Sequence, residues 1–243
     1  DGEHGAAGCA IVAALAETTP AKVSEAEFSF VERVLANGDP RARRVAIDTV
    51  ALIGGSRASD AVAFALADEE RDVRLAAVRA LGRLKRPEPL QGILAQSHDQ
   101  ELVAASLRAL TDADSKQGFE AARALLETAD TATASAAVEA IGRSDHPERE
   151  AALADALGHA DTEVVKLAMT ELARTHSFAR LAVSLDHASW EVRRLASELL
   201  AHVHEANIVE LLRHRLEREK EPVVRDALNA ALSLPPPATF EGS

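Results

Sequence analysis

The sequence predicts an all-α solenoid, in which pairs of helices stack one on the next along the chain. Three observations predict it. A short residue pattern recurs seven times in the 243 residues, at intervals of 28 to 32 residues. Within each copy, apolar residues follow the 3.6-residue period of an amphipathic helix. A shorter apolar-periodic segment precedes each copy, so the repeating unit is a helix, a turn and a second helix.

We call the second helix of each unit the B helix and number its positions from the recurring pattern. Position 0 lies near its start and is occupied by Ala42, Val73, Leu102, Thr133, Val164, Val192 and Val224. Position +8 is always a bulky aliphatic residue: Val50, Leu81, Leu110, Ile141, Leu172, Leu200 and Leu232. Position +4 is small in six copies: Ala46, Ala77, Ser106, Ala137, Ala168 and Ala196. These positions share one helix face, so we expect them to form the core, with a neighbouring helix close to position +4.

Residues at the ends of the B helix fit its two termini. Position −3 is acidic in six copies: Asp39, Glu70, Asp99, Asp130, Asp161 and Glu221. A carboxylate there is favoured by the free N–H groups and the dipole of a helix N-terminus. Gly82 and Gly142, both at position +9, suit the end of a short helix.

The first helix of each unit, the A helix, is predicted from the segments between the B helices. These segments are 24–36, 59–67, 88–96, 118–127, 148–157, 178–185 and 206–218. Residues 7–17 predict an earlier B helix, the end of a leading partial repeat. We therefore predict a partial repeat and turn over 1–23, a solenoid over 24–234, and a proline-rich tail or linker over 235–243. The first residues, DGEHGAAG, include neither an initiator Met nor a basic region, so we expect a segment of a longer protein.

Three of the B-helix sequences carry a resemblance to a known family. DVRLAAVRALGRL, EVVKLAMTELART and EVRRLASELLAHV resemble HEAT repeats of the short bacterial and archaeal kind, which also occur in phycobilin lyase subunits. The resemblance covers roughly residues 24–234. It implies a right-handed α-α superhelix, with A helices outside and B helices lining a concave surface. It says little about function, because such repeats serve scaffolds, adaptors and a few enzymes.

Composition disfavours several classes of partner. With 27 basic and 39 acidic residues, the formal net charge is −12, which disfavours both nucleic-acid backbones and anionic membrane surfaces. The single cysteine, Cys9, excludes an intrachain disulfide and a cysteine-based zinc cluster. We expect a reducing, cytoplasmic location, with Cys9 acting as a small buried hydrophobe and not as a redox-sensing thiol.

The motifs of catalysis and cofactor binding are absent from the sequence. It has no GxxxxGK, GxGxxG, GxSxG or HExxH run, and it has no tyrosine. The turn histidines His98, His159 and His187 are expected to face solvent. Some hydroxylases that resemble this family hold two irons with several His-Glu pairs, whereas this chain offers one after its sixth B helix, His204-Glu205. We therefore expect no metal, no cofactor and no enzymatic activity.

Positions +1, +2 and +6 of the B helices are expected to face the concave side and bind a partner. The predicted binding residues are Arg44, Arg79, Val103, Ala104, Arg108, Ala134, Ser135, Val165, Thr170, Trp190 and Arg194. Small residues in the middle would form a smooth floor, and Ala134→Glu there is expected to leave folding intact. Trp190 is either an anchor for the partner or a filler of the gap between repeats. The expected partner is an acidic or amphipathic segment of another protein.

A competing structural role is predicted for the arginines at position +1. An acid at −3 and an arginine at +1 would bridge adjacent repeats as a ladder. Its members are Asp39, Arg43, Glu70, Arg74, Arg193, Glu221 and Arg225.

The function predicted first is a non-catalytic scaffold or adaptor for protein–protein interaction. A second hypothesis is a chromophore lyase or chaperone-like factor of the phycobilin-lyase group, which would need the aromatic residues that this chain mostly lacks. A third is a nucleic-acid-binding HEAT domain, supported by the arginines of the first repeats and opposed by the net charge.

Overall fold

A computed structural model describes residues 2–18, 23–126 and 130–234, and within these ranges the regular elements are all helices. The chain divides into two compact units, residues 1–122 and residues 123–243. The prediction of an all-α solenoid is confirmed. The predicted tail, 235–243, lies outside the described residues, as does part of the predicted first segment, 19–22.

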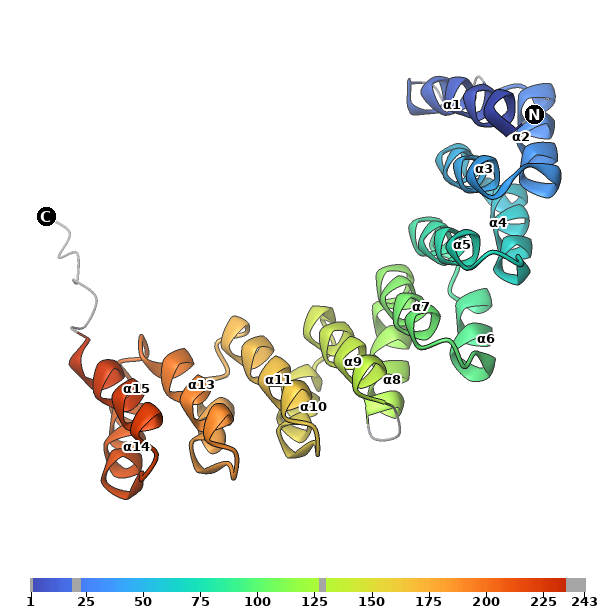
Figure 1. The fold of residues 1–243 in the computed structure, drawn as a ribbon. Helices are drawn as coiled ribbons and strands as arrows, with labels where there is room; N and C mark the ends of the chain where they lie inside the picture. Colours follow the sequence, from blue (N-terminus) through green and yellow to red (C-terminus); the bar gives the residue numbers. More distant parts are fainter. Residues whose placement is uncertain (1, 19–22, 127–129, 235–243) are drawn as a thin grey trace, which may run out of the picture. The chain divides into compact units, whose positions relative to one another are not determined.

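The N-terminal unit consists of two rows of helices (Figure 1). The B helices form one row, in which neighbours pack side by side: α1 (Gly2–Thr18), α3 (Pro40–Ile53), α5 (Arg71–Arg83) and α7 (Gln100–Ala113). The A helices form the other row and pack on the B helices: α2 (Glu25–Asn37), α4 (Gly55–Phe64) with the 3₁₀ turn η2 (Ala65–Ala67), and α6 (Glu88–Gln96). Helix α8 (Ser115–Leu126) spans the boundary between the units.

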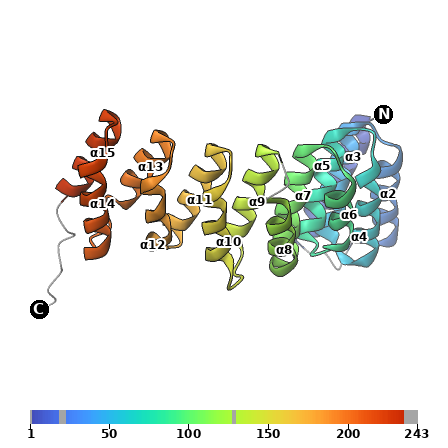
Figure 2. The ribbon, with the colours of Figure 1, turned by 90° about the horizontal axis from the view of Figure 1, so that it is seen from below.

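The C-terminal unit repeats this arrangement (Figure 2). Its B helices are α9 (Thr131–Arg143), α11 (Thr162–Arg174), α13 (Trp190–Leu200) and α15 (Pro222–Ser233). Its A helices are α10 (Arg149–Asp155) with η3 (Ala156–Gly158), α12 (Phe178–Leu181) with η4 (Ala182–Asp186), and α14 (Ala206–Arg218). The B helices of the seven described pairs all begin two residues before the predicted position 0.

The predicted core positions are buried. Positions 0 and +4 are buried in all seven copies, and position +8 is buried in six, with Leu232 half-buried in the seventh. Apolar burial of this kind, repeated along the chain, is the main stabilising contribution to a stack of helical pairs.

The reason predicted for the glycines at position +9 is wrong. Gly82 lies inside α5, and a Cβ added to it would stand 3.0 Å from Cβ of Ala109 and 3.1 Å from its backbone. Gly142 likewise lies inside α9 and faces Glu171 of α11. Both glycines do lie next to last in their helices, near the end as predicted, but they are explained by the close approach of the next B helix and not by capping.

The turn before a B helix is closed by the side chain at position −5. Among the described residues, this side chain accepts the backbone N–H of position −3 in five turns, through Asp68, Ser97, His159, His187 and Glu219. The two histidines accept through Nδ1 at 3.0 Å and are half-buried. The expectation that they simply face solvent is therefore wrong, because they are structural members of the turn.

The predicted ladder between acids at −3 and arginines at +1 is wrong, because two of these arginines bond an acid at −5 of the next repeat and two bond backbone carbonyls. Arg43 pairs with Asp68 of the next repeat at 2.8 Å, and Arg193 grips Glu219 with two hydrogen bonds of 2.8 and 3.1 Å. Arg74 and Arg225 donate to carbonyls of their own turns, at 2.8 to 3.0 Å. Position +1 therefore points toward the turns that join the repeats.

The acids at −3 have separate roles. Asp39 caps α3 by accepting the N–H of Ala42 at 2.8 Å. Asp99 caps α7 and also pairs with Arg71 of the preceding repeat, and the hydrogen bond from Arg71 lowers the pKa of Asp99 to about 2. Glu70 and Glu221 stand at N-cap positions without a side-chain cap bond.

Substituting Ala137 by arginine tests the core register. Ala137 is fully buried in α9, so Ala137→Arg places a charge and a long side chain in the core. We expect the free energy of unfolding to fall by about 3 kcal/mol or more. Ala132→Arg, at an exposed position of the same helix, should change it by less than about 1 kcal/mol. Equal urea midpoints for the two variants would refute the register.

The buried carboxylate of Glu219 predicts a loss of stability in acid. The hydrogen bond from Arg193 holds the pKa of Glu219 far below its usual range, against the opposing effect of burial. The carboxylate therefore stabilises the fold above its unfolded pKa of about 4.3, and this stabilisation is lost as the pH falls below that value. Glu219→Gln should lower the free energy of unfolding near pH 7 by about 3 kcal/mol, because Arg193 stays buried.

Urea unfolding at neutral and at acid pH measures both effects. The difference between wild type and Glu219→Gln should shrink at about pH 3.5. Glu217→Gln, an exposed change on the same helix, removes the same charge and should behave as wild type. A pH-independent difference would show that the carboxylate of Glu219 is not the group responsible.

Candidate docking surface

The predicted floor of the B-helix face is not a surface. Four of its members are buried: Val103, Ala104, Ala134 and Val165. Within each unit, neighbouring B helices pack against one another, so positions +1 and +2 lie close to the adjacent repeat. The expectation that these residues are exposed is wrong, and Ala134→Glu is now expected to destabilise the fold because Ala134 is fully buried.

Other predicted binding residues do lie at or near the surface. Arg44, Arg79, Thr170 and Trp190 are exposed, and Arg108, Ser135 and Arg194 are half-buried. Arg44 lies 3.7 Å from Asp72, and Arg194 pairs with Glu198 at 2.6 Å. Trp190 is 42% exposed at the first position of α13, so it is not a buried filler. The binding role of these residues stays a prediction.

Phe64 is a more distinctive surface residue, on the opposite face. It is 87% exposed, the highest fraction among the large apolar side chains of the described residues. Val62 and Ala65, on either side of it in α4 and η2, are buried, so the helical register directs position 64 outward. Phe64 stands at position −9 of its repeat, where the other copies hold Arg33, Ile93, Ala124, Asp155, Val183 and Arg215.

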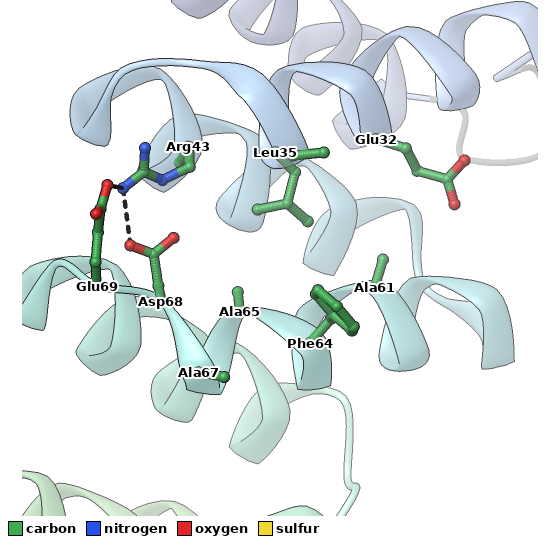
Figure 3. Close-up of a pocket in the computed structure, with 10 residues that line it drawn as sticks. Glu32, Leu35, Arg43, Ala61, Phe64, Ala65, Ala67, Asp68 and Glu69 are labelled. Atoms are coloured by element: carbon green, nitrogen blue, oxygen red, sulfur yellow. Dashed lines mark hydrogen bonds and ion pairs between the residues drawn. The ribbon is translucent and has the colours of Figure 1, made fainter.

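One recess lies between Phe64 and α2, with a volume of about 460 Å³ (Figure 3). Leu35 of α2 faces Ala65 and Phe64 across it. Its apolar lining consists of Leu35, Ala36, Ala61, Phe64, Ala65 and Ala67. Charged residues at its ends complete the lining: Glu32, Arg43, Asp68 and Glu69.

A second recess lies between Phe64 and α6, with a volume of about 490 Å³. It shares Phe64 and Ala67 with the first. Its other lining residues are Ala63, Leu66, Pro89, Gly92, Ile93, Gln96 and Ser97, and every described residue that lines it is uncharged. We call the two recesses and the ring between them the Phe64 surface.

The first recess has more acidic than basic side chains in its lining, and they differ in how far ion pairs already engage them. Arg43 is held by Asp68 at 2.8 Å and by the carbonyl of Gly38 at 2.8 Å. Burial by itself raises the pKa of Asp68, but hydrogen bonds from Arg43 and from the N–H of Glu70 outweigh it, so the pKa lies below its ordinary value. The side chain of Glu69 is 83% exposed and 3.7 Å from Arg43. Of the three carboxylates, Asp68 is held by Arg43 and Glu32 by Arg57, so Glu69 is the exposed acid of the recess.

Gly92 keeps the second recess open. It lies inside α6, where glycine is about 1 kcal/mol less favourable than alanine. A Cβ added to Gly92 would meet nothing within 4 Å, so packing does not require a glycine here. The missing side chain leaves space that a larger residue would fill.

The register that locates Phe64 was available in the sequence. Counting nine residues back from each position 0 gives one aromatic among two arginines, an aspartate, an alanine and two aliphatics. The predicted binding residues came from the B helices alone, so Phe64 on an A helix was missed. The glycine at 92 gave a weaker signal, because a helical glycine can have many causes.

The remaining candidate chemistry lies elsewhere or is not assembled. Cys9 is fully buried, and burial raises the pKa of its thiol to about 11, as fits a small core residue. Within 2–18, 23–126 and 130–234, no three His, Cys, Asp or Glu side chains gather closely enough to hold a metal ion. In the same ranges no helix has the length and apolar character needed to cross a bilayer.

Comparison with known families explains the stack. The model of HEAT repeats matches residues 29–101 and 87–174, which together are more than half of the chain. The chain belongs to the HEAT-repeat family. A comparison with curated protein sequences found no match.

One solved structure agrees with this fold, and two others are reported beside it. The crystal structure of YibA from Escherichia coli shares 13% identity, covering 91% of this chain and 96% of that one, with a TM-score of 0.53. Human deoxyhypusine hydroxylase in complex with glycerol shares 19% identity over 93% and 96%, with a TM-score of 0.41. The CpcE–CpcF complex of phycocyanin lyase from Nostoc shares 17% over 86% and 82%, with a TM-score of 0.38. At these identities the likeness concerns the fold alone.

Two glycine-to-alanine changes test the packing at and beside the surface. Gly92→Ala should raise the free energy of unfolding by about 1 kcal/mol, because the new methyl group meets open space in a helix. Gly82→Ala should lower it, since its Cβ would press on Ala109. Thermal and urea unfolding of both variants measure the signs. Stabilisation by both changes would contradict the close approach of α5 and α7.

Proposed function

We propose that this HEAT-repeat protein is a non-catalytic scaffold that binds another protein, and that it binds it at the Phe64 surface. The observation that carries the proposal is the exposure of Phe64 between two apolar recesses. An exposed aromatic ring flanked by recesses is typical of a protein-binding surface, where aromatic residues act as anchors.

The energetics support binding at this place. Burying a phenylalanine side chain that is otherwise exposed contributes about 1.5 to 3 kcal/mol. Ring and recess walls stand on α2, α4 and α6, which pack on the B-helix row, so the surface is held in shape before a partner arrives. Stacked repeats form extended surfaces of this kind.

The chemical groups of the surface support binding over catalysis. The second recess offers apolar walls, one amide and one hydroxyl, from Gln96 and Ser97. In the first recess, Asp68 is engaged by Arg43, and Glu32 is paired with Arg57 at 2.5 Å. Groups already held in ion pairs suit recognition better than proton transfer.

A photo-crosslinking residue at position 64 tests the proposal. Benzoylphenylalanine replaces Phe64 in one variant and Asp155 in another, which is the same register position in the C-terminal unit. After irradiation in cells of the native host, we expect an adduct with a second protein at position 64 and none at position 155. The same adducts from both positions, or none from position 64, would exclude the Phe64 surface as the binding site.

A further inference from the structure

The Phe64 surface is asymmetric in charge, and this asymmetry specifies a partner. We infer that the partner segment is a cationic amphipathic helix, with its basic residues over the first recess and apolar side chains in both recesses. This inference rests on the proposed function, because it names the chemistry of the protein bound there.

The negative charge of the first recess is open to a partner. Glu69 is exposed at its mouth, and Arg43 already donates to Asp68 and to Gly38, so its guanidinium does little to attract a second acid. Arg57 is also engaged, since it pairs with both Glu25 and Glu32 and lies 4.6 Å from the ring of Phe28. Lysine or arginine on the partner therefore complements this end.

The second recess favours an uncharged side chain on the partner, whereas the first favours a basic one. With uncharged walls and space above Gly92, it accepts an aliphatic or aromatic side chain and disfavours a charged one. A segment that crosses from α2 to α6 thus meets an acidic end, then Phe64, then an apolar end. This order fixes the direction in which the segment lies.

The spacing suits a helix. Packed helices lie about 8 to 10 Å apart, so side chains that enter the recesses on either side of α4 are separated by roughly 10 Å. A helix rises 1.5 Å per residue, and residues i and i+7 on one face are separated by about that distance. Residues i+3 and i+4 of the same face then lie against the ring of Phe64.

Two other occupants fit the charge less well. A second copy of this chain has a net charge of −12, so it would bring acid to an acidic surface. The last nine residues of the chain contain one glutamate and no lysine or arginine. A second copy is a distinguishable outcome of the experiment below.

Designed peptides test the inference directly. The first probe is a labelled helical peptide of about 18 residues with leucines at i, i+4 and i+7 and lysines flanking them. A second probe replaces the lysines by glutamates, and a third replaces the leucines by alanines. Fluorescence anisotropy with the full chain should give at least about tenfold tighter binding for the first probe than for either of the others.

Two substitutions locate the binding. Gly92→Phe places a ring at the second recess from a position where the added Cβ meets nothing within 4 Å, and it should weaken binding of the first probe by about tenfold. Gly158→Phe is the matched control, since Gly158 is an exposed glycine of η3 with open space around it. Glu69→Lys should weaken binding at low salt, and the loss should shrink at high salt.

Several outcomes would overturn the inference. These are no binding of the lysine–leucine peptide, equal binding of the glutamate–leucine peptide, or indifference to Gly92→Phe. Sedimentation that shows dimers abolished by Gly92→Phe would identify a second copy as the occupant. If position 64 still crosslinks to another protein while the peptides fail, the proposed function stands and the cationic helix is wrong.

Discussion

Side-by-side packing of B helices is the constraint on which the rest of this fold depends. A helix flanked on two sides needs small residues where its neighbours approach, which explains the alanines at +4 and the glycines at +9. The same packing turns position +1 inward. It also leaves the outer face of the A helices as the side on which a large apolar residue such as Phe64 remains in water.

The helical period predicted most of the fold from the sequence. It did not predict which residues lie at the interfaces between repeats. Positions 0, +4 and +8 follow from periodicity alone. Arg43 and Ala134 occupy the same position +1, yet the sequence analysis assigned one to a ladder and the other to a partner surface. Both lie between repeats. Which turn residue an arginine reaches depends on how one repeat is displaced from the next, and a single repeat does not encode that displacement.

The candidate surface was predictable only in part, for a related reason. The register marks Phe64 as unusual, since it is the one aromatic at a position where other repeats place arginine, aspartate, alanine, isoleucine or valine. The two recesses beside it depend on the side chains of three A helices that are far apart in sequence. One of them is open because Gly92 has no side chain. The sequence of a single helix does not show that this position borders a recess.

The charge network around Glu219 has a consequence for how the last two described helical pairs open. Here Arg193 of α13 and Arg215 of α14 meet on one buried carboxylate, and Arg215 also holds Asp186 at 2.9 Å. Detaching the last helical pair would break the ion pair between Arg193 and Glu219 and leave the charged side chain of Arg193 without this partner. We therefore expect the last two described pairs to open together, with amide hydrogens of α14 exchanging with solvent in step with those of α13.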